Sequence, residues 1–139
     1  MTEFKIVIGA KDGKCYQKEI KDDQALVLHK KRIGETVSGD KLGMPGYEFE
    51  LTGGSDKCGF PMRKGISEPR KKVMISGGVG FSGKDRNKNK QKGLFKRVTV
   101  CGEMVTKIIR QINLKVIKEG PKPLAEAPAE EVKEEPKKE

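Results

Sequence analysis

The chain has 139 residues, of which 36% are charged and 34% hydrophobic, and its net charge is +10. This length suits one domain with a modest core, and a composition this polar is typical of a protein whose surface is used for binding. No apolar run approaches the roughly 20 residues that a membrane span needs, and the N-terminus lacks an apolar signal region, so we expect a cytoplasmic protein without a membrane partner.

The N-terminal third of the chain predicts a hairpin followed by a helix. Apolar side chains alternate over residues 4–8 with the period of a strand, and residues 15–20 can return beside them after a tight turn at 11–14. A helix is predicted over residues 24–33, because this segment contains no helix breaker and Gly34 follows it as a C-terminal cap. Its apolar side chains would dock on the sheet.

Short apolar stretches predict the remaining strands. Residues 47–51 and 112–116 alternate apolar and polar side chains, as half-buried strands do. The runs at 73–75 and 98–100 predict two shorter strands, and residues 104–109 are expected to continue the sheet after a turn. Glycine turns separate these stretches, which favours a small barrel over a sandwich or a doubly wound sheet.

The composition changes after Gly120. Residues 121–139 consist mainly of Pro, Ala, Glu and Lys, and such a segment buries too little apolar surface to offset its ordering entropy. We therefore predict a disordered tail over residues 121–139 and one ordered domain over residues 1–120. The predicted fold class is mostly β: a small β-barrel-like domain of about six to seven short strands with one α-helix, followed by the disordered C-terminal tail.

The net charge of the chain lies in one stretch. Between residues 56 and 97 there are thirteen Lys and Arg against three Asp and Glu, so this stretch alone carries +10 and the rest of the chain is balanced. A charge excess this localised predicts a polyanionic partner, and nucleic acid is the commonest one. We take its basic residues as candidate RNA-binding residues: Lys57, Arg63, Lys64, Arg70, Lys71, Lys72, Lys84, Arg86, Lys88, Lys90, Lys92, Lys96 and Arg97.

The strongest field is expected between Lys84 and Arg97, where seven positive charges face one negative charge within fourteen residues. Phosphates would neutralise these charges and release counterions, and glycines let the backbone approach a phosphate. RNA is a better prediction than DNA, because no helix here suits a DNA major groove and loops can follow an irregular surface. Phe60 and Phe81, each inside a glycine-rich basic loop, could stack on bases. For Phe60, packing in the core is the preferred interpretation, because Pro61 and Met62 follow it.

One glycine motif argues for a nucleotide site, but its surroundings argue against it. Residues 78–84 match the dinucleotide fingerprint and most of the phosphate-binding loop. Asp85 stands where Ser or Thr would hold magnesium, and residues 86–93 lack the apolar face of the helix that both motifs require. His29 is the only histidine, and the three cysteines form no C-x-x-C pair. We therefore expect no enzyme, no cofactor, no metal site and no small-molecule substrate.

Residues 53–65 read Gly-Gly-Ser-Asp-Lys-Cys-Gly-Phe-Pro-Met-Arg-Lys-Gly. This stretch resembles the characteristic segment of ribosomal protein S-six of the archaeal and eukaryotic type, in its short archaeal-like form. Residues 70–78 and 111–120 agree with the same family in the same order, so the resemblance covers nearly all of residues 1–120. The chain departs from the family at four positions that are expected to be polar or basic: Leu94, Phe95, Val98 and Cys101.

The resemblance implies a small β-barrel-like domain that is a structural constituent of the cytoplasmic small ribosomal subunit, without catalysis. Its implied partners are small-subunit rRNA and neighbouring ribosomal proteins. By motif it implies rRNA contacts in two basic loops, the first over residues 53–65 and the second over residues 77–97. The implied contacts are Lys57, Arg63, Lys64, Lys84, Arg86, Lys92, Lys96 and Arg97. The alternative hypothesis is a free RNA-binding module or RNA chaperone that acts outside the ribosome.

Overall fold

The computed structural model describes residues 3–21, 23–122 and 124. Seven strands, one α-helix and one 3-10 turn make up the regular structure of these residues, so the predicted mostly-β class is confirmed. In chain order they are β1 (Glu3–Gly9), β2 (Cys15–Lys21), α1 (Asp23–Leu28), β3 (Thr36–Ser38), η1 (Asp40–Leu42), β4 (Glu48–Asp56), β5 (Arg70–Ile75), β6 (Lys96–Cys101) and β7 (Ile109–Lys118).

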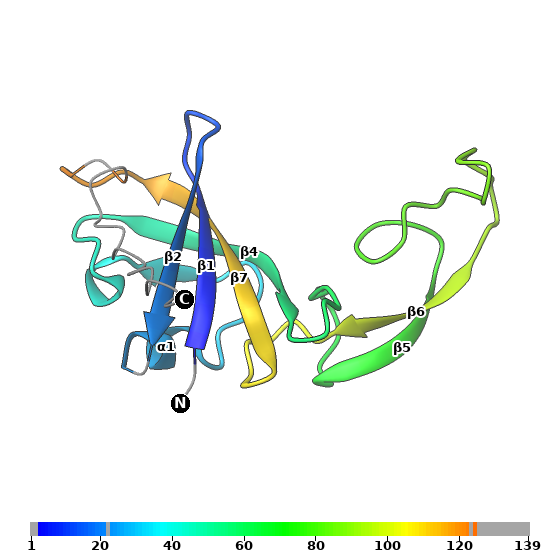
Figure 1. The fold of residues 1–139 in the computed structure, drawn as a ribbon, viewed down its shortest axis with the longest axis horizontal. Coiled ribbons are helices and arrows are strands. Elements are labelled where there is room, and N and C mark those ends of the chain that lie inside the picture. Colours follow the sequence, from blue (N-terminus) through cyan, green and yellow to red (C-terminus); the bar gives the residue numbers. More distant parts are fainter. Residues whose placement is uncertain (1–2, 22, 123, 125–139) are drawn as a thin grey trace, which may run out of the picture.

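Five of the strands form one curled sheet, in the order β2-β1-β7-β4-β3 (Figure 1). β1 and β7 run parallel with Lys5 opposite Gln111, and the other neighbouring strands of this sheet are antiparallel. Because strands twist, the sheet curls into a half-barrel and the side chains of one face converge. The period-two pattern of the sequence supplies that face with apolar side chains: Phe4, Ile6, Ile8, Phe49, Leu51, Ile112, Leu114 and Val116 are all buried.

The helix is shorter than the sequence predicts. α1 ends at Leu28, and Lys30 adopts a left-handed backbone conformation with φ 67°. The amide of Lys30 donates a hydrogen bond to the carbonyl of Val105 at 2.9 Å, and the amide of Val105 donates to the carbonyl of Lys31 at 2.8 Å. The prediction of a helix over 24–33 is therefore wrong at its C-terminal end, because pairing with a distant segment replaces the last helical turns.

The same pairing corrects a second prediction. Residues 104–109 do not form a strand that continues the sheet: Met104 makes one isolated bridge with Arg32, and β7 begins only at Ile109. The short bridge and the turns after it supply backbone hydrogen bonds to the segment that the prediction assigned to a strand. Both errors come from one contact between segments that are far apart in the sequence.

The residues just after β7 contact the domain. The Tyr47 hydroxyl donates a hydrogen bond to the carbonyl of Lys122, and Leu124 is partly buried against the core. The rest of the predicted tail, residue 123 and residues 125–139, lies outside the described residues. Within the described ranges, no helix combines the length and the apolar character that a membrane crossing requires.

Candidate nucleic-acid interface

Most of the basic stretch, from Arg70 onward, lies on an arm that projects from the sheet. β5 and β6 pair as an antiparallel two-stranded ribbon, from Arg70 opposite Cys101 to Ile75 opposite Lys96. Figure 1 shows the ribbon leading away from the five-stranded sheet, with the long loop of residues 76–95 at its far end. We call the ribbon together with this loop the arm. Because the loop lies at the far end of the ribbon, its cations lie far from the core of the domain.

One face of the ribbon is covered by the arm's own loop. Ile75 and Val100 are buried on this face, and a Cβ built at Gly80 would lie 3.2 Å from Val100 and 3.6 Å from Ile75. Gly80 has φ +98°, a conformation that glycine adopts without strain. The guanidinium of Arg63 donates a hydrogen bond to the carbonyl of Val79 at 2.9 Å. The first basic loop thus holds the start of the second against the ribbon.

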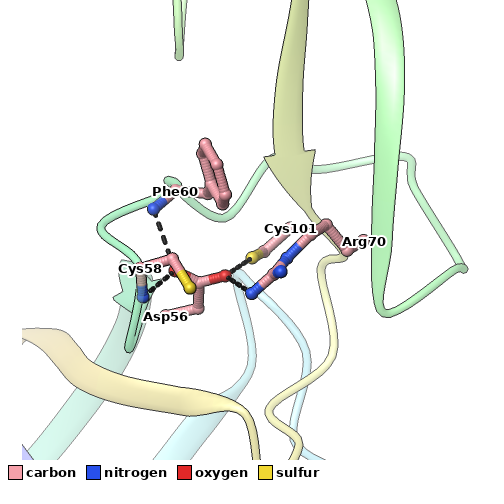
Figure 2. A network of polar contacts seen from close by, with 5 residues as sticks. All are labelled: Asp56, Cys58, Phe60, Arg70 and Cys101. Atoms are coloured by element: carbon pink, nitrogen blue, oxygen red, sulfur yellow. Dashed lines mark hydrogen bonds and ion pairs between the residues drawn. The ribbon is translucent and has the colours of Figure 1, made fainter.

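A buried carboxylate joins the sheet to the base of the arm (Figure 2). One oxygen of Asp56, Oδ1, accepts hydrogen bonds from the amides of Cys58 at 2.8 Å and Phe60 at 2.9 Å. The other oxygen, Oδ2, accepts from the guanidinium of Arg70 and from the Cys101 thiol, the latter at 3.2 Å. The Arg70 guanidinium also lies 5.1 Å from the centre of the Phe60 ring. The end of β4, the loop after it and both strands of the ribbon therefore meet at one side chain.

These contacts shift the acidity of the groups involved. Burial by itself would raise the pKa of Asp56, but hydrogen bonds from Phe60, Cys101, Arg70 and Cys58 outweigh burial and hold that pKa below its ordinary value. Burial, followed by the neighbouring Asp56, raises the pKa of the Cys101 thiol to about 11. Cys101 therefore stays protonated at neutral pH and acts as a donor to the ionised carboxylate.

The Asp56 network leads us to expect a specific dependence of stability on pH. Ionised Asp56 stabilises the fold above its unfolded pKa of about 3.9, and this contribution is lost as the pH falls through the lower folded pKa. We expect Asp56→Asn to lower the free energy of unfolding at neutral pH by about 1 to 3 kcal/mol, because an amide nitrogen cannot accept the bonds of Arg70 and Cys101. Urea denaturation measures this difference.

Between about pH 5 and pH 2 the unaltered chain should then lose more stability than Asp56→Asn, because only the unaltered chain has this carboxylate to protonate. Asp12→Asn is the matched control, since Asp12 lies exposed in the turn between β1 and β2 and makes none of these contacts. The same acid dependence in Asp56→Asn and in the unaltered chain would contradict the role of the network.

The thirteen predicted RNA-binding residues fall into two groups. Three have a hydrogen-bond or salt-bridge partner in the protein: Arg70 with Asp56, Arg63 with the Val79 carbonyl, and Lys71 with Glu68 at 2.8 Å. The other ten are exposed, and in the described part of the chain none has a carboxylate within salt-bridge distance. They are Lys57, Lys64, Lys72, Lys84, Arg86, Lys88, Lys90, Lys92, Lys96 and Arg97.

The far end of the arm is a compact turn. Lys84 and Lys90 form an isolated bridge, the amide of Asp85 donates to the Asn89 carbonyl at 2.9 Å, and the amide of Lys88 donates to the Asp85 carbonyl at 2.8 Å. Lys88 takes a left-handed conformation with φ 63° to close this turn. The turn brings the cations of residues 84–90 close together, which raises the local positive potential. The glycine motif at residues 78–84 runs into this turn and not into a helix.

Sequence reasoning missed the role of Asp56. The alternation of residues 47–51 buries odd positions and would leave Asp56 exposed. The irregularities of β4 between Leu51 and Gly53 and between Ser55 and Asp56 change the facing of this side chain, which is buried. Sequence reasoning also proposed Phe60 and Phe81 as stacking residues, and the structure gives both rings a cation of the chain itself. Arg70 lies over Phe60, and the Lys96 ammonium lies 6.0 Å from the centre of the Phe81 ring.

Comparisons with known proteins agree on one family. The family model described as Ribosomal protein S6e matches residues 4–129. The small ribosomal subunit protein eS6 of Archaeoglobus fulgidus is 42% identical over 127 residues, which cover 89% of this chain and 94% of that protein. The proteins of the same name from Natronomonas pharaonis and Methanosphaera stadtmanae are each 41% identical, over 86% and 91% of this chain and 89% and 93% of their own lengths.

Proposed function

Because the chain belongs to the ribosomal protein S6e family, we propose that it is a structural constituent of the small ribosomal subunit and binds rRNA through its two basic loops. The family is structural and not enzymatic. The half-barrel is the body that holds the arm, and the arm presents cations to folded RNA in the cytoplasm. Neighbouring ribosomal proteins are its further partners.

One observation carries the proposal of rRNA binding: ten exposed cations lie on the arm and its base, and in the described residues none is paired with a carboxylate. Like charges held this close repel one another, so the free chain gains nothing from them. RNA phosphates would neutralise the cations and release condensed counterions. The binding is therefore electrostatic, and the ribbon supplies the geometry that positions it on the RNA.

The two basic loops have different parts in this mechanism. Lys57 and Lys64 lie near the joint between sheet and arm, where the Asp56 network limits how the backbone can move. The cations of residues 84–92 lie at the far end of the arm, and with the strands of the ribbon behind them they reach RNA well away from the sheet. The first loop would fix the orientation of the protein, and the second would supply most of the affinity.

Sucrose-gradient fractionation of cells that express a tagged chain tests the proposal. A ribosomal constituent is expected in the small-subunit fractions before and after a moderate salt wash. Release into the top fractions during the wash would contradict the proposal and would support the alternative of an RNA chaperone outside the ribosome. The washed subunits should also contain the chain in about equal amount to other small-subunit proteins.

A further inference from the structure

The two faces of the β5–β6 ribbon differ in what lies over them. Residues at odd positions of β5 and even positions of β6 share the face that the loop around Gly80 covers. The other face carries Lys72 opposite Thr99 and Met74 opposite Arg97, because successive side chains of a strand point to opposite sides. We call this second face the open face. Lys72, Met74 and Arg97 are exposed on it.

Exposed apolar side chains gather on the arm. Of the five large apolar side chains that are exposed in the described residues, three lie on the arm: Met74 at 65%, Phe95 at 60% and Val79 at 49%. Phe95 comes two residues before Arg97, at the end of the ribbon where Met74 lies. Unlike Phe60 and Phe81, whose rings face Arg70 and Lys96, Phe95 has no cation over its ring in the described part of the chain. A flat apolar ring is thus left open beside cations.

The surroundings of these apolar side chains fit RNA better than another protein surface. Arg97 is the cross-strand neighbour of Met74, and Lys72 precedes Met74 by two residues on the same face. Neither cation has a carboxylate within salt-bridge distance in the residues that the structure describes. A nucleotide offers both features that this arrangement can bind, since its base stacks on aromatic, thioether or guanidinium groups and its phosphate is negative.

We propose that the open face of the ribbon binds an unpaired nucleotide of RNA, with its base against Phe95 and Met74 and its phosphate at Lys72 and Arg97. This inference rests on the proposed binding of rRNA and goes beyond it, because phosphate contacts alone need no apolar surface. A fully paired helix does not expose a base face, so the RNA at this point is a bulge, a loop or a strand end.

A tryptophan probe tests the stacking directly. The chain has no Trp, so Phe95→Trp introduces its sole indole at the proposed site. Titration with small-subunit rRNA of Archaeoglobus fulgidus, transcribed in vitro, is expected to quench the fluorescence of Phe95→Trp, because a stacked base quenches an indole. Leu26→Trp is the matched control, since Leu26 lies on α1 outside the arm and is 63% exposed; its fluorescence should stay unchanged.

Affinity and its salt dependence separate stacking from charge. The double variant Met74→Ala with Phe95→Ala should bind this rRNA about tenfold more weakly, with the same slope of log affinity against log salt. The double variant Lys72→Gln with Arg97→Gln should reduce that slope by about one to two. All four side chains are exposed, and circular dichroism confirms that each variant is folded.

The following results would overturn the inference. Binding of Phe95→Trp to the rRNA without quenching would show that no base lies on residue 95. Full rRNA affinity of the alanine double variant together with its loss from assembled subunits would show that the open face docks a neighbouring protein. If the unaltered chain does not bind the rRNA, the proposed rRNA contact is wrong, and this inference with it. If the unaltered chain binds the rRNA and the alanine double variant binds it with the same affinity, only the inference is wrong.

Discussion

Reversal of Lys84, Arg86, Lys88 and Lys90 to glutamate is expected to abolish incorporation of the chain into the small ribosomal subunit while leaving its fold intact. These side chains are exposed at the far end of the arm, and none of them packs in the core. If each contacts one phosphate, their loss alone removes about three to four units of salt slope, and the new negative charges add repulsion. Co-sedimentation with small subunits measures incorporation, and circular dichroism measures the fold.

A matched control separates charge at the arm from charge in general. Reversal of Lys11, Lys14, Lys41 and Lys115 changes the net charge by the same amount on exposed positions outside the arm. This control is expected to co-sediment at a clearly higher level than the arm variant. Normal co-sedimentation of the arm variant would contradict the proposed function of the second basic loop.

Replacement of Gly54 by alanine is expected to destabilise the domain by about 3 kcal/mol. A Cβ built at Gly54 would lie 2.2 Å from the carbonyl oxygen of Gln111 and 3.1 Å from the Met62 sulfur. The first of these contacts is with the backbone of β7, which pairs with β4 at this point and cannot move without breaking its hydrogen bonds. Urea denaturation measures the loss of stability.

The neighbouring glycine provides the control for this substitution. A Cβ at Gly53 would meet no atom within 4 Å, so Gly53→Ala is expected to change the free energy of unfolding by no more than about 0.5 kcal/mol. The two variants differ by one position in the same strand. Equal stability of Gly53→Ala and Gly54→Ala would contradict the close approach of β4 and β7.

Local patterns predicted six of the seven described strands, because burial of one sheet face imposes alternation on the sequence. β1, β4 and β7 lie where this alternation is clear, β2 follows the predicted tight turn, and β5 and β6 lie where short apolar runs occur. β3 lies in a stretch for which no strand was predicted. The prediction of the helix was wrong at its C-terminal end for a different reason. Nothing within residues 24–33 shows that Lys30 and Lys31 pair with Val105, because the competing partner comes from a distant segment.

The candidate site shows the same division between local and distant information. The sequence was enough to locate the basic stretch, because the charge of each side chain follows from its residue type alone. It did not separate Arg63 and Arg70 from the other cations, because their partners are the carbonyl of Val79 and the carboxylate of Asp56. Both of these arginines look like RNA contacts and instead bind groups of the chain itself, and only Arg63 lies in the characteristic segment, residues 53–65. Whether Lys57 and Lys64 contact RNA stays a prediction.

The parallel pairing of β1 with β7 sets the order in which a growing chain can complete this fold. β1 lies between β2 and β7 in the sheet, so one of its edges stays unpaired until residues 109–118 have been synthesised. During that interval the β1–β2 hairpin exposes both an apolar face and an open strand edge, which are sites of aggregation. The arm is synthesised earlier and needs no contact with β1, so its cations can meet RNA while the half-barrel is still open. The proposed binding of rRNA by the arm therefore does not require the sheet to be closed.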